Sequence, residues 1–285
     1  MWGCWCVLGR AEAPRLHSVE FWREIVRRDY AVPAGADPAA LARELAGHVG
    51  NPDPEWRDAL GYTITAEWVR RGTLAGKDLR ELMPVWRQHL GGKGPEAVLG
   101  RAFGALNLAL AAAVDAQAPF LAEDEYRGLL DEALAVLVDE RDLRGWDPRE
   151  GWVHVTAHAA DLLKWLVRSP RARPADQARV FDAIARRLET APTVFTHGEP
   201  DRLAAVVVAI ALRDDFDRAG FLAVMRRLAE LPEGFTGIAP EPAAYAARRN
   251  AVAFVEAVYF ALGVQGVKHP AARETAAALL AAVSG

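Results

Sequence analysis

The feature that most constrains this chain is a succession of apolar segments with helical spacing, separated by short breaks. Within each segment apolar side chains recur every three or four residues, which is typical of one buried face of an α-helix. Glycine and proline end one segment before the next begins, as in Gly50-Asn51-Pro52 and in residues 91–95 (GGKGP). No strand-like alternation of useful length appears. The pattern predicts an all-α protein of about twelve helices, stacked as antiparallel helix pairs.

Capping residues place the first helix boundaries. Ser18 and Asp37 precede apolar-periodic segments and can accept hydrogen bonds from free amides of the first helical turn, and Asp53 does the same for the third. Residues 232–242, with three prolines and two glycines, predict the most flexible loop. The expected helices cover residues 18–28, 38–49, 53–71, 77–90, 96–116, 122–140, 151–169, 175–190, 200–212, 216–231, 243–262 and 270–283.

Composition excludes several classes of protein. The 34 basic and 38 acidic side chains give a net charge of −4, which lacks the basic surface of a nucleic-acid binder. No run of about 18 uninterrupted apolar residues occurs, so we expect no membrane span.

The two cysteines, Cys4 and Cys6, form neither a disulfide framework nor a zinc-site spacing. We therefore expect a cytoplasmic protein with a disordered leader at residues 1–17 and one helical-repeat domain at 18–285.

An internal period supports a repeat fold. Polar residues recur near the start of alternate expected helices, at intervals of about 44 to 53 residues, close to the roughly 40–47 residues of a HEAT-type repeat. These residues are Arg57-Asp58, Arg101, His154, Asp201-Arg202 and Arg248-Arg249. If every second helix lines the inner wall, the pattern predicts an α-α superhelix with these side chains along one edge of its concave surface.

The strongest cluster of chemically active residues lies in residues 151–169 (GWVHVTAHAADLLKWLVRS). At about 100° per residue, His154, His158, Asp161 and Trp165 fall within an arc of roughly 60°. The opposite arc is apolar, so we expect the histidines to face away from the core, towards water or a groove. His154, His158 and Asp161 are the candidate catalytic residues.

Three interpretations of this cluster stay open. Two histidines four residues apart can share a metal ion, but Asp161 lies about 10 Å along the axis from His154, so His197, Glu199 or Asp201 would have to supply a third ligand. Val155 stands where the zinc-protease pattern requires glutamate. The alternatives are a metal-free ligand or acid–base site, in which Asp161 orients an imidazole, and structural hydrogen bonding.

Other polar residues have a structural and a functional interpretation. Arg144, in the charged segment 139–145, either ties down its loop or binds an anion through its planar guanidinium. Arg57 and Asp58 form an ion pair in the structural interpretation. Trp152 and Trp165 flank the histidines and can wall a pocket for an apolar or cyclic ligand. No nucleophile elbow, phosphate loop or dinucleotide fingerprint is present.

Four segments resemble the bacterial domain of unknown function 2785 family: residues 53–62 (DPEWRDALGY), 99–110 (LGRAFGALNLAL), 140–163 (ERDLRGWDPREGWVHVTAHAADLL) and 201–207 (DRLAAVV). The resemblance extends from Phe21 to Leu212 and implies a HEAT-like superhelix, but no activity. Its motif residues in this chain are Arg57, Asp58, Arg101, Arg144, Gly145, Trp152, His154, His158, Asp161 and Arg202.

These observations lead to one functional expectation and two alternatives. We expect a binding module that holds a small-molecule or peptide ligand in a concave groove, without an obligatory cofactor. The alternatives are a hydrolase-like enzyme, acid–base or assisted by a divalent metal on His154 and His158, and a protein-interaction scaffold. Besides the catalytic candidates, the expected ligand-binding residues are Arg57, Asp58, Arg101, Arg144, Trp152, Trp165, His197, Glu199, Asp201 and Arg202.

Overall fold

The computed structural model describes residues 16–283, and over this range the protein is all-α, as the apolar pattern predicts. Twelve α-helices, one π-helix, one 3₁₀ turn and two short antiparallel strand pairs make up the described part. The helices are α1 (Val19–Arg27), α2 (Pro38–Ala46), α3 (Thr63–Arg70), α4 (Gly76–Leu90), α5 (Val98–Gln117), α6 (Glu123–Asp139), α7 (Val155–Leu166), α8 (Pro174–Thr190), α9 (Glu199–Ala211), α10 (Arg218–Ala229), α11 (Pro242–Gln265) and α12 (Pro270–Val283). The other elements are η1 (Glu55–Tyr62, π), η2 (Pro95–Ala97, 3₁₀), β1 (Trp146–Asp147), β2 (Gly151–Trp152), β3 (Phe235–Thr236) and β4 (Ala239–Pro240).

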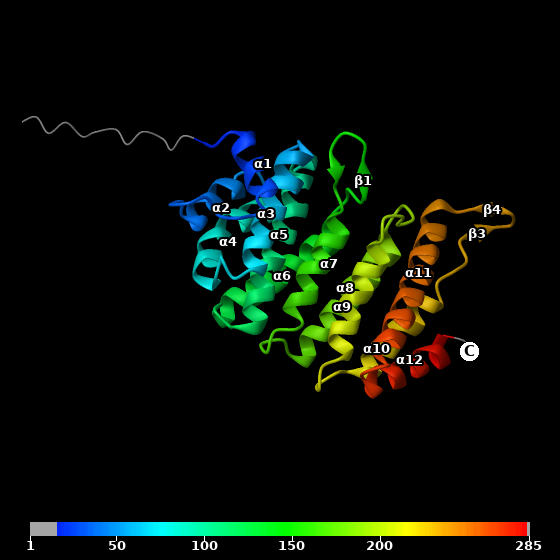
Figure 1. Ribbon diagram of the computed structural model, residues 1–285. Helices are drawn as coiled ribbons and strands as arrows, with labels where there is room; N and C mark the ends of the chain where they lie inside the picture. Colours follow the sequence, from blue (N-terminus) through cyan, green and yellow to red (C-terminus); the bar gives the residue numbers. More distant parts are fainter. Residues whose placement is uncertain (1–15, 284–285) are drawn as a thin grey trace, which may run out of the picture.

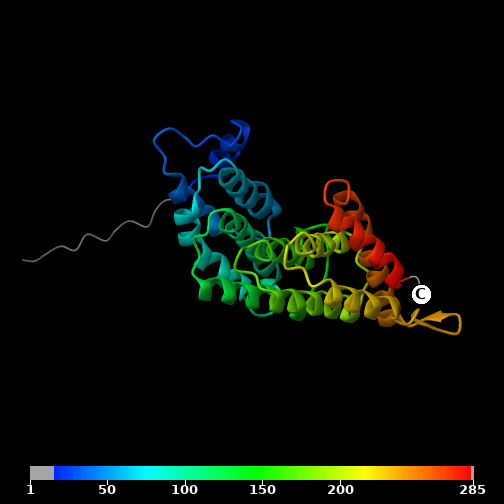
Figure 2. The same cartoon turned by 90° about the horizontal axis from the view of Figure 1, so that it is seen from below.

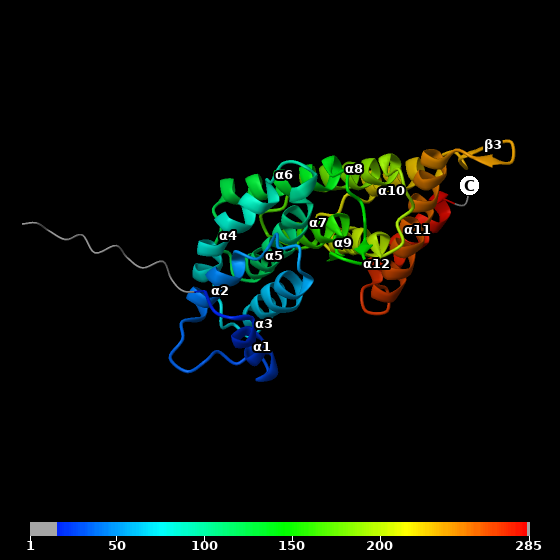
Figure 3. The ribbon, with the colours of Figure 1, turned by 90° about the horizontal axis from the view of Figure 1, so that it is seen from above.

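The helices stack in two layers in the order of the sequence (Figure 1). One layer contains α5, α7, α9 and α11, each packed on the next, and the other contains α6, α8 and α10 (Figures 2 and 3). The layers join where α6 packs on α7 and α8 on α11, and α12 closes the end against α10 and α11. The stack of helix pairs follows from the short links between helices; its winding as a HEAT-type superhelix stays a prediction.

Helix α5 is the apolar centre of the N-terminal half. Gly104 lets it approach α4 closely, because a Cβ at this position would lie 2.8 Å from the backbone nitrogen of Leu90. The segment Pro95–Gln117 is long and apolar enough to cross a membrane, with a mean hydropathy of 1.7, but 67% of its most apolar window is buried inside the fold. Its composition is therefore accounted for by its place in the core.

Helix α7 differs from its prediction in two respects. It begins at Val155 rather than near residue 151, because Gly151 and Trp152 pair with β1 in a hairpin and His154 adopts a left-handed conformation (φ 50°) before the first turn. It is also buried on every side by α5, α6 and α9, so His158 and Asp161 are only 7% and 5% exposed. This face borders a groove, one of the two surroundings expected for it, but its side chains are far less exposed to water than a surface face would be.

The helix expected over residues 53–71 is divided. Its first half is the π-helix η1 and its second half is α3. A Cβ at Gly61 would lie 2.7 Å from the carbonyl oxygen of Trp56, five residues earlier, so glycine permits this close approach. Single π segments of this kind occur frequently at functional sites.

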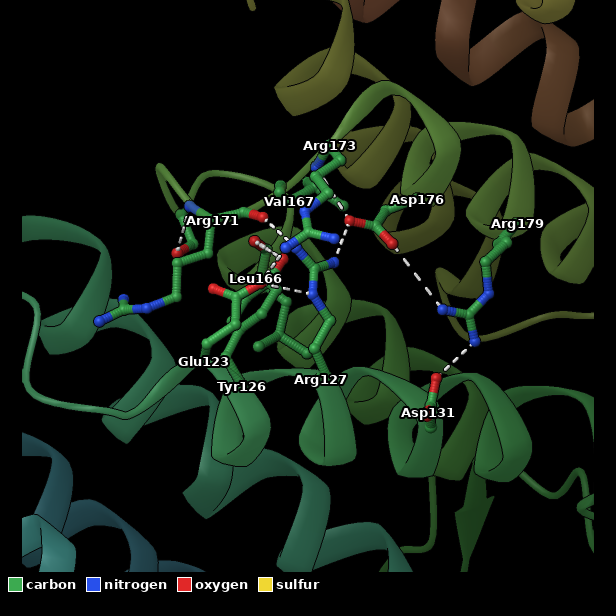
Figure 4. Close-up of polar contacts among 12 residues, drawn as sticks. Glu123, Tyr126, Arg127, Asp131, Leu166, Val167, Arg171, Arg173, Asp176 and Arg179 are labelled. Carbon is green, nitrogen blue, oxygen red and sulfur yellow. Dashed lines mark hydrogen bonds and ion pairs between the residues drawn. The ribbon is translucent and has the colours of Figure 1, made fainter.

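Polar contacts fix the C-terminal end of α7 (Figure 4). The Tyr126 hydroxyl on α6 donates a hydrogen bond to the Leu166 carbonyl over 3.0 Å. Arg127, one residue further on, pairs with Asp176 on α8 and donates to the Arg171 carbonyl over 2.6 Å. These bonds satisfy free carbonyls at the helix end and hold α7 in register with the outer layer.

Two expectations concern the chain ends and the long loop. Residues 1–15 of the expected leader, including Cys4 and Cys6, lie outside the described residues. His17, by contrast, bonds Glu44 through Nδ1 at 2.7 Å and stacks on Phe21. Within residues 232–242, the β3–β4 hairpin projects beyond the end of the stack in Figure 1.

Candidate functional site

A groove with a volume of about 670 Å³ runs beside α7. Five parts of the chain form its walls: η1, α5, α7, the β1–β2 hairpin and the start of α9. The side chains that line it include nine of the thirteen candidate site residues of the sequence. These nine are Asp58, Trp152, His154, His158, Asp161, Trp165, His197, Asp201 and Arg202.

The long walls of the groove are two helices with different chemistry. Phe103 and Leu110 on α5 face the groove, as do His158 and Trp165 on α7. Both pairs are seven residues apart, about two helical turns. The Phe103 ring meets the His158 ring edge-on at 5.0 Å. The α5 wall is apolar, whereas the α7 wall presents imidazole, carboxylate and ammonium groups.

His154 is held in one orientation at the hairpin end of the groove. Its Nε2 lies 3.0 Å from the His197 carbonyl oxygen and 3.5 Å from Oε1 of the buried Glu199. Both partners accept hydrogen bonds, so we assign the Nε2–H tautomer. The Trp152 indole stacks on this imidazole at 4.8 Å. Burial lowers the pKa of His154, and the charge of Glu199 partly opposes that shift.

His158 lies one turn further along α7 and is more deeply enclosed. Burial, reinforced by the neighbouring His154, lowers its pKa to about 3. Its Nδ1 is buried and makes no hydrogen bond of good geometry among the described residues, although the Ala102 backbone lies close enough to the ring to oppose part of the fall in its pKa. A buried polar atom without a partner is uncommon in native proteins and normally indicates a bound water, ion or ligand.

Asp161 is bound by two cations. Lys164 donates to Oδ1 over 2.8 Å and Arg202, from α9, donates to Oδ2 over 2.5 Å. Tyr62 of η1 faces the same part of the groove, and burial together with the charge of Asp161 raises the pKa of its phenol. These four side chains provide alternating hydrogen-bond donors and acceptors at the α9 side of the groove.

Asp58 contributes a carboxyl group from η1. Its Oδ1 lies 2.7 Å from Nε of Arg57, which lowers its pKa, but burial is the larger effect and raises that pKa to about 6. The side chain is 24% exposed and borders the groove. A carboxyl group with a pKa near neutrality in a groove is a candidate acid–base residue.

Four expected site residues do not line this groove. Arg57 is buried behind it, where it donates to the carbonyls of Asn51, Glu150 and Trp152. Glu199 is buried behind His154 and accepts a hydrogen bond from the His197 amide over 2.9 Å. These two residues support the site rather than facing it.

The other two belong elsewhere. Arg101 pairs with Glu140 and donates to the carbonyls of Gly92 and Gly94, in a separate cavity of about 780 Å³. Arg144 pairs with Asp142, Asp147 and Glu150 on the outside of the β1–β2 hairpin. The expectation that Arg101 and Arg144 line one site with the histidines is wrong. Arg101 is bound to Glu140 and to loop carbonyls, and Arg144 is bound to the carboxylates of its own hairpin.

The structure groups no three histidine, cysteine or acidic side chains that could hold a metal ion within the described range. His154 and His158 lie with ring centroids 5.6 Å apart, and the third ligand that their spacing requires is not supplied. A structural or catalytic zinc site normally has at least three protein ligands.

Sequence reasoning did not select Tyr62, Phe103 or Lys164 as site residues. Tyr62 is four residues after Asp58 and Lys164 is three residues after Asp161, so helical spacing from expected site residues was the available signal for these two, whereas Phe103 had no such signal. Gly145 has a direct role: a Cβ there would lie 2.5 Å from the His197 ring, so only glycine lets that ring pack against the hairpin.

Comparison with known proteins places the chain in a family without assigning an activity. A family model described as protein of unknown function (DUF2785) matches residues 87–260. The match includes α5, α7 and α9 but not the 53–62 segment of η1, and it extends beyond Leu212. No curated protein and no solved structure matches the chain.

Proposed function

This chain belongs to the DUF2785 family of proteins of unknown function, and from that premise we propose that the groove beside α7 binds a small polar ligand with an apolar face. The observation that carries the proposal is the groove itself, which brings the apolar wall of α5 against the imidazoles of His154 and His158 and the charged group Asp161–Lys164–Arg202. The buried Nδ1 of His158, which makes no hydrogen bond of good geometry among the described residues, adds to this observation, because leaving such an atom unpaired costs about 1–3 kcal/mol.

The size and lining of the groove support this proposal. Its volume of about 670 Å³ lies within the range of small-molecule sites, roughly 300–1,000 Å³. Such sites combine apolar walls with a few fixed polar groups. Here Phe103 and Leu110 supply the apolar wall, while hydrogen bonds and ion pairs fix His154 and Asp161.

A thermal-shift screen of a metabolite library tests the proposal. A ligand present at about 100 times its Kd raises the unfolding free energy by roughly 2.7 kcal/mol. We expect at least one compound to stabilise the wild-type protein in this way. The same compound should give no thermal shift with Leu106→Trp, whose indole fills the groove from α5. Val267→Trp, at a site that is 85% exposed, is the control. Equal shifts in wild type and Leu106→Trp would contradict the proposal.

A second candidate function, acid–base catalysis on the bound ligand, is favoured by Asp58 and His154. Asp58 has a pKa near neutrality, and His154 is oriented through Nε2 so that Nδ1 is left to accept a proton. Mass spectrometry of the ligand after incubation checks this candidate. We expect product with wild type and at least about 100-fold less with Asp58→Asn; an unchanged ligand would leave a binding function alone.

A further inference from the structure

The charges around the groove are compensated within the protein. Asp58 lies beside Arg57, and Asp161 lies between Lys164 and Arg202. Asp201, the third carboxylate in the lining of the groove, adds a negative charge. Burial lowers the pKa of both His154 and His158, so they add no positive charge at neutral pH. Three carboxylates and the three cations Arg57, Lys164 and Arg202 therefore balance at the groove, whose lining does not include Arg168, and no excess positive charge favours an anion there.

The polar groups instead alternate as donors and acceptors over short distances. Lys164 and Arg202 donate on either side of the Asp161 carboxylate, and the neutral His158 imidazole, with one donor and one acceptor nitrogen, lies one turn away. A hydroxyl group both donates and accepts, so neighbouring ring hydroxyls match such a row without bringing charge. A ligand with only acceptors, such as a phosphate, matches just half of it.

Aromatic side chains lie at both ends of this row. Trp152 borders the groove at the hairpin end, where His154 supports it by stacking, and Trp165 borders the other end. The Arg168 guanidinium lies 4.6 Å from the Trp165 ring centre and braces that indole. From Val155 to Trp165 the helix rises about 15 Å, which is long enough for two linked sugar rings.

We propose that the ligand is a neutral saccharide of one or two rings, with its hydroxyls on the Asp161–Lys164–Arg202 cluster and its apolar ring faces on Trp152 and Trp165. This inference rests on the proposed function of the groove and names the class of ligand. Apolar C–H faces pack against indole rings, which have a large apolar surface. The hydroxyls then take the donors and acceptors that the charged cluster presents.

Isothermal titration of the full chain at pH 7 tests the inference. The neutral probes are glucose, galactose, N-acetylglucosamine, cellobiose and maltose; the comparison probes are glucose 6-phosphate and adenosine. We expect at least one neutral saccharide to bind, and to bind at least about tenfold more tightly than glucose 6-phosphate. Trp165→Ala and Arg202→Gln should each weaken it by about tenfold or more.

Matched controls separate binding from folding. Arg202 on α9 is 50% exposed and forms an ion pair with Asp161 on α7. Arg227 on α10 is 44% exposed and forms the corresponding ion pair with Glu189 on α8. Arg227→Gln and Phe260→Ala, a 72% exposed aromatic on α11, should leave the affinity unchanged.

Two results would overturn the inference, and they differ in what they leave standing. If adenosine or glucose 6-phosphate binds and no neutral saccharide does, the ligand class is wrong but the groove remains a binding site, provided that Arg202→Gln weakens that binding. If none of the probes binds and the metabolite screen gives no groove-dependent shift, both proposals fail.

Discussion

Asp58 and His158 show how strongly burial controls the ionisation of single residues in this groove. Both have pKa values moved towards their neutral forms, Asp58 upwards to about 6 and His158 downwards to about 3. The two shifts have opposite effects on stability. His158 stabilises the folded protein as pH rises from about 3 to 6.5, whereas ionisation of Asp58 destabilises it as pH rises from about 4 to 6.

The Asp58 effect is measurable by substitution. Asp58→Asn removes the carboxyl group, so the variant should gain stability relative to wild type as pH rises from 4 to 7, and the difference in unfolding free energy should increase by roughly 1–3 kcal/mol. Denaturant titrations at several pH values check this change. Asp147→Asn should show no such rise between pH 4 and 7, because hydrogen bonds from the backbone of Glu150 and Arg149 lower the pKa of Asp147, so its contribution to stability changes only at more acidic pH. Parallel trends for both variants would contradict the account.

Gly145 offers a second test at the residue scale. In Gly145→Ala the new Cβ would meet the His197 ring at 2.5 Å, so the ring must move, and we expect a loss of about 1–3 kcal/mol in unfolding free energy. Gly263→Ala, where a Cβ meets nothing within 4 Å in the helix α11, should gain about 0.5–1 kcal/mol. Chemical denaturation of the two variants should therefore give changes of opposite sign.

At the scale of elements, Arg57 joins η1 to the β1–β2 hairpin behind the groove. Its guanidinium donates to the carbonyls of Asn51 and Pro52, just before η1, and to those of Glu150 and Trp152 in the hairpin. It also lies 4.7 Å from the Phe103 ring centre. The side chain is fully buried. The π-helix and the hairpin therefore form one connected wall, which carries Asp58 and Trp152.

Removal of this link should release the hairpin. We expect Arg57→Ala to cost about 3–5 kcal/mol, since it leaves the Asp58 charge and the carbonyls without their partner. Hydrogen exchange of residues 145–152 should rise along with this loss. Arg144→Ala, which removes ion pairs that are 43% exposed on the same hairpin, should cost less than about 1 kcal/mol. A similar cost for the two variants would show that Arg57 is no more important than a surface residue.

At the scale of the whole molecule, most of the fold could be predicted from the spacing of apolar residues. The caps at Ser18 and Asp37 are confirmed, since their side chains accept hydrogen bonds from Phe21 and from Ala39 and Ala40. The π-helix could not be predicted, because it depends on a close backbone approach at Gly61 that apolar spacing does not record. The start of α7 at Val155, later than the apolar spacing predicts, depends on pairing between β1 and β2.

The site was predictable only in part, for a physical reason. His158 and Asp161 lie on one helix, so helical spacing alone predicts correctly that they share a face. The positions of Arg101 and Arg144 were predicted wrongly because each forms an ion pair with a nearby carboxylate. The partner of Arg101 is Glu140, and that of Arg144 is Asp142. Which pairs form across helices is decided by packing, which a repeat period alone does not determine.

The central claim is that the groove beside α7 is the ligand site, and the indole N–H signals of the nine tryptophans test it most directly. Titration of a bound metabolite or saccharide, followed by two-dimensional NMR with Trp152→Phe and Trp165→Phe for assignment, should shift the signals of these two residues. The signals of Trp22 and Trp68, buried in the core, should stay in place. Ligand-induced shifts that leave Trp152 and Trp165 unchanged would contradict the claim.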